Sequence, residues 1–134
     1  MKLLLILMTF VTTAQASQDR WSILLNLINQ EEKTINMAKR KGPGLKYRLF
    51  ELKSERIKIW QKKENEAFMN KSTKGIKVSR KQAFKTTRSL YKKAMRYGLK
   101  IAKQHPKSNI VPSIYYTLGL NSRDFSQDKK EYVF

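Results

Sequence analysis

The sequence predicts an all-α protein made of antiparallel helical hairpins. Apolar residues recur at three- and four-residue steps along several segments, which is the spacing of an amphipathic helix. Two of these segments are separated only by Gly42-Pro43-Gly44, a short break that ends one helix and lets the next fold back against it. Pro106 interrupts the chain again, because proline has no amide hydrogen and disfavours a helical residue before it.

An N-terminal hairpin is expected over residues 17–70, with its helices over residues 19–40 and 45–69. The second helix has two apolar stripes, so it should contact two neighbours, as in a three-helix bundle or a solenoid. The stripe of the first helix consists of Trp21, Leu24, Ile28, Ile35 and Ala38. The two stripes of the second helix are Leu45, Leu49, Leu52, Ile59, Trp60 and Ala67, and then Tyr47, Phe50, Ile57 and Phe68.

A polar and basic segment over residues 71–78 is predicted to be a flexible loop. Ser79 and Gln82 fit a capping box, so a third helix is expected from residue 79 to about residue 103. A fourth helix is expected over residues 110–120 with Asn109 as its cap, followed by a polar break over residues 121–127 and the first turns of another helix. Because the sequence then ends on apolar residues, we expect residues 79–134 to be an incomplete part of a repeat array.

The N-terminal residues have the three parts of a secretory signal peptide. Met1-Lys2 supplies positive charge, residues 3–11 form an apolar run, and Ala14 and Ala16 make a small-x-small cleavage site. The apolar run is far shorter than the roughly 20 residues that span a bilayer, so an uncleaved anchor is the weaker alternative, as is an ordinary buried helix. We therefore expect residues 1–16 to be removed and the mature chain, without a transmembrane span, to be periplasmic or secreted.

The stretch from Leu90 to Gly119 resembles the joint between two tetratricopeptide repeats. Ala94 precedes Pro106 by twelve residues, as the alanine of such a repeat precedes its closing proline, and Leu118-Gly119 follows at the interval of the bacterial version. The resemblance covers about a third of the chain and is closest to proteins of the bacterial cell envelope. It implies a fragment of an α-solenoid with a concave surface for a protein partner. The residues expected to pack the repeats together are Ala94, Gly98, Pro106, Leu118 and Gly119.

Positive charge dominates the composition. The chain has 29 Lys and Arg against 10 Asp and Glu, a formal charge of +19. Residues 71–107 hold thirteen basic residues and no acidic one, and such a local excess favours anionic partners. Seven cations fall on one face of the third helix, opposite its apolar face. We call them the basic ridge: Lys81, Lys85, Arg88, Lys92, Arg96, Lys100 and Lys103.

We expect no enzymatic activity, no cofactor and no metal site. The sequence has no cysteine, and its one histidine, His105, stands before the proline with no evident partner. It has no glycine-rich phosphate loop and no nucleophile elbow. The paired glutamates have Lys or Arg at helical distance, as ordinary surface ion pairs do: Glu31 with Glu32, Glu51 with Glu55, and Glu64 with Glu66.

Two functions are favoured for an exported helical protein of this kind, and a third, a secreted toxin or cationic effector, has no feature of the sequence in its favour. The first is a non-catalytic helical-repeat scaffold for protein–protein interaction in the cell envelope, with Tyr91, Tyr115 and Tyr116 as contacts, although a core position is favoured for each tyrosine. The alternative is a basic envelope protein that binds a polyanion such as a cell-wall polymer, lipopolysaccharide or an acidic surface. A ridge kept basic only for solubility is the simplest explanation of the charge. Nucleic acid is disfavoured as a partner by the export signal and by the lack of zinc-ligand spacing or a recognition helix.

Overall fold

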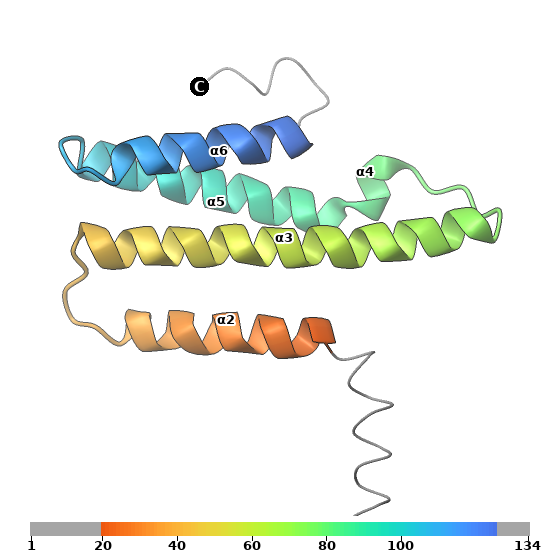
Figure 1. The fold of residues 1–134 in the computed structure, drawn as a ribbon, viewed down its shortest axis with the longest axis horizontal. Coiled ribbons are helices and arrows are strands. Elements are labelled where there is room, and N and C mark those ends of the chain that lie inside the picture. Colours follow the sequence, from red (N-terminus) through yellow and green to blue (C-terminus); the bar gives the residue numbers. More distant parts are fainter. Residues whose placement is uncertain (1–19, 126–134) are drawn as a thin grey trace, which may run out of the picture.

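Long helices joined by short turns make up residues 20–125, the part of the chain that the computed structural model describes (Figure 1). This part contains five helices and no strand, so the all-α prediction is confirmed. The four long helices run alternately in opposite directions (Figure 1). The predicted signal peptide, with Ala14 and Ala16, and the predicted last helix lie outside the described residues. The helices are α2 Arg20–Asn36, α3 Pro43–Thr73, α4 Arg80–Ala83, α5 Lys85–Gln104 and α6 Val111–Phe125.

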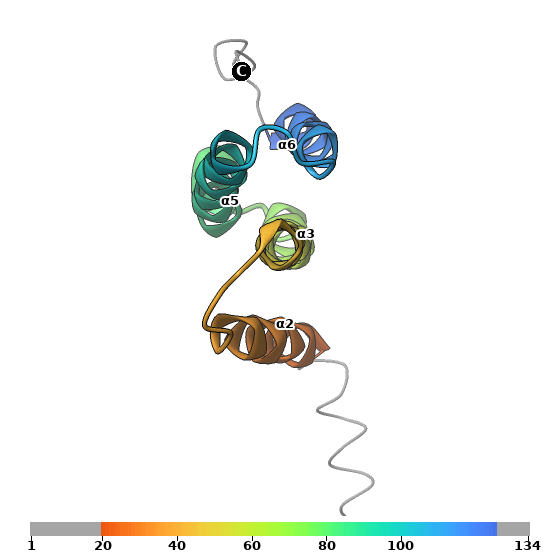
Figure 2. The ribbon, with the colours of Figure 1, turned by 90° about the vertical axis from the view of Figure 1, so that its left-hand side faces the viewer.

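Helix α3 is the centre of the fold, with α2 on one side and α5 and α6 on the other (Figure 2). Leu49 and Leu52 face α2, where they pack with Ile28 and Ile35. The second stripe, which includes Phe50, faces α5 and α6. The two predicted stripes of this helix therefore do contact two neighbours. Not every residue of the predicted stripes is covered: Leu45 and Ala67 of α3 are exposed, and so is Leu24 in the stripe of α2.

A close contact between α3, α5 and α6 forms at Gly98. A Cβ atom added there would lie 2.7 Å from Cε2 of Phe50 and 3.2 Å from Cγ2 of Ile114, and both of those side chains are fully buried. Ala94 of α5 and Leu118 of α6 are also buried. Only the absence of a side chain at this position lets the helices approach so closely.

Two of the five residues expected to pack the repeats together, Gly119 and Pro106, are not buried between helices. Gly119 is exposed, and a Cβ atom there would meet nothing within 4 Å, so close packing does not require a glycine at that position. Pro106 lies in the turn after α5, which ends at Gln104, close to the predicted end of the third helix.

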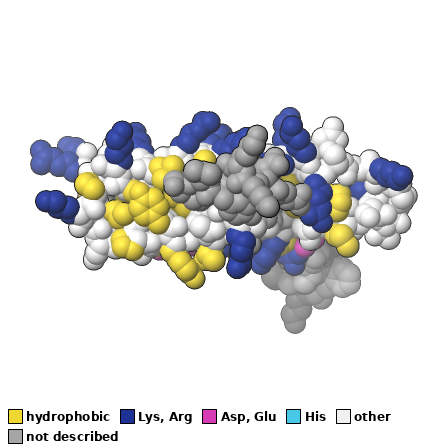
Figure 3. All heavy atoms as spheres, turned by 90° about the horizontal axis from the view of Figure 1, so that it is seen from above, with side chains coloured by type: hydrophobic (Ala, Val, Ile, Leu, Met, Phe, Trp, Pro, Cys, Tyr) yellow, Lys and Arg dark blue, Asp and Glu magenta, His cyan; other side chains and the backbone are white. Residues whose placement is uncertain are grey.

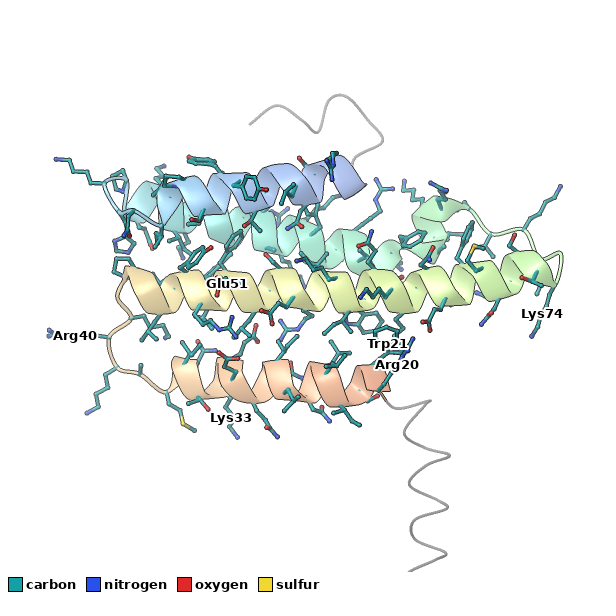
Figure 4. All side chains as sticks on the ribbon, viewed as in Figure 1. Arg20, Trp21, Lys33, Arg40, Glu51 and Lys74 are labelled. Atoms are coloured by element: carbon teal, nitrogen blue, oxygen red, sulfur yellow. The ribbon has the colours of Figure 1, made fainter. Side chains whose placement is uncertain are left out.

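Ion pairs supply much of the contact between α2 and α3. Arg48 donates two hydrogen bonds to Glu31, at 2.6 and 2.9 Å, and Arg56 reaches Glu32 at 2.8 Å. At the start of α2, Arg20 and Trp21 point toward α3 (Figure 4), where Arg20 forms an ion pair with Glu66 at 2.5 Å. The predicted glutamate pairs therefore include ion pairs that join two helices rather than successive turns of one helix.

The contact between α2 and α3 should weaken in acid. Hydrogen bonds from Arg48 hold the pKa of Glu31 below its ordinary value of 4.5, so this ion pair contributes stability above that pH and loses it as the pH falls through the lowered pKa. We expect backbone amides of α2 to lose hydrogen-exchange protection between about pH 6 and pH 3.5, while those of α5 keep theirs. Glu31→Gln should remove part of the pH dependence. Equal protection of α2 at both pH values, after correction for intrinsic exchange rates, would contradict this prediction.

The predicted third helix is interrupted at Phe84. Phe84, with a φ of −108° and a ψ of 28°, separates the single turn of α4 from α5. Oγ of Ser79 accepts a hydrogen bond from the amide of Gln82, which is one of the two bonds of the predicted capping box. The side chain that satisfies the start of α5 comes from α3. Glu64 accepts hydrogen bonds from the amides of Thr86 and Thr87, at 3.3 and 2.6 Å, and from Oγ1 of Thr87 at 2.5 Å. Glu64 is thus a helix cap and is not part of a surface ion pair.

Three helix boundaries also differ from the predicted ones. Helix α3 continues to Thr73, into the segment predicted as a loop, and α6 continues to Phe125, through part of the predicted polar break. In the turn before α6, Oγ of Ser108 accepts a hydrogen bond from the amide of Ile110 at 3.4 Å, and no hydrogen bond between Asn109 and the first turn of α6 is present. Helix α2 ends at Asn36, earlier than the glycine and proline residues that were expected to end it.

Candidate functional site

The basic ridge lies on the face of α5 that is turned away from the core. Thr87, Tyr91, Ala94, Gly98 and Ile101 are buried on the opposite face of the same helix. This arrangement follows from helical spacing, since residues three and four positions apart share a face. Six of the seven ridge residues belong to α5, and all of these are exposed except Arg88, which is half-buried. The seventh, Lys81, is exposed on α4, beyond the break at Phe84.

The ridge is a long linear array of charge. From Lys85 to Lys103 it covers 18 residue steps, which is about 27 Å along the helix axis at 1.5 Å per residue. Successive side chains are three or four residues apart, so their Cβ atoms are about 5–6 Å from each other. This spacing is smaller than the screening length of about 8 Å at physiological salt, so neighbouring cations repel one another.

Between residues 20 and 123 every acidic residue is a glutamate that belongs to a helix other than α5 or α6. These six glutamates belong to α2 and α3; five of them form ion pairs with arginines of the same two helices, and Glu64 accepts hydrogen bonds from the start of α5. Residues 67–123 contain 14 basic residues and no acidic one. Figure 3 shows the side of α5 and α6, where Lys and Arg side chains are distributed along the molecule and acidic side chains are almost absent. Among the described residues, no carboxylate forms an ion pair with the ridge.

Two of the three candidate tyrosines are exposed. Tyr115 and Tyr116 of α6 have exposed fractions of 49% and 70%, so the expectation that they belong to the core is wrong. Tyr91 is buried on α5 against Ile57 and Ala94, in agreement with a core position. The side of α5 and α6 therefore presents aromatic side chains as well as cations, and aromatic rings of this kind are common at protein interfaces.

His105 has a partner that the sequence did not indicate. Nζ of Lys46, at the start of α3, lies 3.1 Å from Nε2 of His105 and 3.1 Å from Oε1 of Gln104. These contacts join the end of α5 to the beginning of α3. Between residues 20 and 123 no cluster of three His, Cys, Asp or Glu side chains could hold a metal ion, and no helix is long and apolar enough to cross a bilayer.

A second surface feature lies at the turn between α3 and α4, which the sequence analysis treated only as a polar loop. The turn contains a hollow of about 360 Å³. The signal in the sequence is the pair of apolar residues, Ile76 and Val78, placed among lysines in an otherwise polar segment. The residues that line the hollow are Phe68, Ser72, Gly75, Ile76, Lys77 and Val78.

No family model, curated protein or solved structure matched the chain when they were compared with it. The resemblance to a tetratricopeptide joint therefore stays a prediction, and the function has to be argued from the residues themselves.

Proposed function

We propose that this chain is a non-catalytic binding protein of the cell envelope that holds an anionic partner along the basic ridge. The observation that supports the proposal best is the lack of any carboxylate paired with the ridge among the described residues, although every glutamate there has a cationic or amide partner. Surface cations kept only for solubility would be expected to be interspersed with acidic residues. The predicted signal peptide supports a location outside the cytoplasm.

Binding would relieve repulsion within the ridge. A polyanion lying along α5 places negative charge beside each cation and releases its own counterions to the solution. A linear polymer with closely spaced charges suits a row about 27 Å long better than a single small anion does. Raising the salt concentration from about 0.1 M to about 1 M shortens the screening length from roughly 10 Å to 3 Å, so the affinity should fall steeply.

The test compares two variants of equal charge. Lys85→Gln, Lys92→Gln and Arg96→Gln together remove three ridge cations, while Lys33→Gln, Arg40→Gln and Lys58→Gln remove three exposed cations elsewhere. Binding of the full exported chain to soluble polyphosphate is measured by titration calorimetry at about 0.1 M salt. We expect the ridge variant to bind at least about ten-fold more weakly and the control variant to stay within about three-fold of the natural chain.

Equal losses in the two variants would show that binding follows net charge and would overturn the proposal. The second candidate function, a scaffold with tetratricopeptide-like packing that binds a protein, is favoured by the exposed Tyr115 and Tyr116. The same two variants separate it from the first. The scaffold would be favoured by an envelope protein that binds the ridge variant as tightly as it binds the natural chain. That protein should also stay bound in about 1 M salt.

A further inference from the structure

The turn between α3 and α4 is at the far end of the longest helix. Helix α3 has 31 residues and α5 has 20, and the end of α3, which Lys74 follows, lies beyond the helices packed beside it (Figures 1 and 4). We call residues 69–80 the tip. Side chains here can reach a flat partner before the rest of the molecule does.

The backbone of the tip is held in a defined conformation. Gly75 has a φ of 74°, in the left-handed region that favours glycine, and its amide donates a hydrogen bond to the carbonyl of Ser72 at 3.0 Å. The amide of Ile76 donates to the carbonyl of Lys71 at 2.9 Å, which completes a Schellman motif at the end of α3. The position of Ile76 is therefore fixed by the helix end.

Apolar side chains at the tip are exposed to solvent. Ile76 and Met69 have exposed fractions of 52% and 55%. Ile76 also lines the hollow together with Phe68 and Val78, and the ring of Phe68 packs against that of Phe84, with ring centroids 6.0 Å apart. One exposed isoleucine is ordinary on a protein surface, but Ile76 belongs to a group of apolar side chains, with Phe68 and Val78, at the end of the longest helix.

Four cations lie within five residues of Ile76 in the sequence of the tip. All four are exposed, and none forms an ion pair with a carboxylate of the described residues. The nearest acidic residue in the chain before the tip is Glu66, which is paired with Arg20. The cations of the tip are Lys71, Lys74, Lys77 and Arg80.

We infer that the tip binds the surface of a bilayer that contains anionic lipid. Ile76 and Met69 enter the boundary between headgroups and acyl chains, while the four cations lie at the level of the lipid phosphates. An apolar centre with a basic border matches this interface, where both attractions act together. A soluble polyanion could use the cations but would leave the apolar side chains in water. The inference does not depend on the basic ridge, since no ridge residue belongs to the tip.

The experiment uses the full exported chain and vesicles of phosphatidylcholine with or without about one third phosphatidylglycerol. Ile76→Ser is compared with Ile23→Ser, because Ile23 on α2 is exposed to nearly the same extent, at 53%. We expect Ile76→Ser to lower partitioning onto the anionic vesicles about ten-fold and Ile23→Ser to change it less than about two-fold. Neither change should alter polyphosphate binding, which separates this result from the test of the ridge.

A second measurement reports insertion directly. The chain has no cysteine, so Ile76→Cys and Ile23→Cys can each carry a single environment-sensitive fluorophore. Emission from position 76 should shift to the blue with anionic vesicles, and emission from position 23 should not. Three results would overturn the inference: no shift at position 76, an equal loss of vesicle binding in both serine variants, or equal binding to neutral vesicles. Vesicle binding that depends on Ile76 would support it even if the ridge proved to bind nothing.

Discussion

Gly98→Ala destabilises the protein, although the same replacement stabilises most helices. In the middle of a helix, alanine is favoured over glycine by about 1 kcal/mol. At this position the new Cβ atom would lie 2.7 Å from Cε2 of Phe50, whose side chain is fully buried and has no free space to enter. Overpacking of this kind costs about 1–3 kcal/mol, so after the gain in helix preference we expect a net loss of up to about 2 kcal/mol in the free energy of unfolding.

Gly119→Ala is the matched control. Gly119 lies within α6, is exposed, and has no atom within 4 Å of the position where a Cβ would be added. Only the helix preference acts there, so its free energy of unfolding should rise by about 0.5–1 kcal/mol. Urea denaturation of both variants measures the two changes. A Gly98→Ala variant as stable as the Gly119→Ala variant would mean that Phe50 and Ile114 can move apart, contrary to the packing described.

Glu64→Ala should lower the free energy of unfolding by about 2–3 kcal/mol. The change removes the acceptor for two amides at the start of α5 and leaves the fully buried hydroxyl of Thr87 without its partner on α3. It also removes a negative charge from the positive end of the helix dipole. Glu64→Gln keeps the size of the side chain and one acceptor oxygen, so it should cost about half as much.

Glu66→Gln serves as the control for Glu64→Gln, because both remove one negative charge from the same helix. The ion pair of Glu66 with Arg20 is about half exposed, so its loss should cost less than about 1 kcal/mol. Hydrogen exchange gives a local measurement, since the amides of Thr86 and Thr87 should exchange faster only when Glu64 is changed. Equal destabilisation by the two glutamine variants would show that Glu64 contributes only as a surface charge.

Patterns within one helix could be predicted from the sequence because they depend only on spacing. The two stripes of α3 and the exposed side of α5 follow from the positions of apolar and basic residues along a 3.6-residue turn. The close contact at Gly98 was also foreseeable, because a small residue in an apolar stripe indicates that two helices approach each other there. The capping box at Ser79 is a local signal of the same kind.

Features that depend on a distant partner could not be predicted in this way. The start of α5, next to the break at Phe84, is capped by Glu64, which is more than 20 residues away in the chain. An apolar stripe shows which side of a helix is apolar, but a neighbouring helix decides whether that side is covered. Leu24, Tyr115 and Tyr116 are exposed for this reason. At the tip, the polar composition predicted a flexible loop, whereas the structure has a defined turn in which Gly75 adopts a positive φ.

Between residues 20 and 123 the glutamates are confined to α2 and α3, so the charge of this part of the chain is unevenly distributed. Residues 20–66 carry 12 basic and 6 acidic residues, whereas residues 67–123 carry 14 basic and none. In the field of a negatively charged surface, such a molecule rotates before contact and arrives with α5 and the tip in front. Fewer encounters then fail through wrong orientation, so the rate of association should rise above that of an evenly charged protein of the same net charge, and salt should lower this rate.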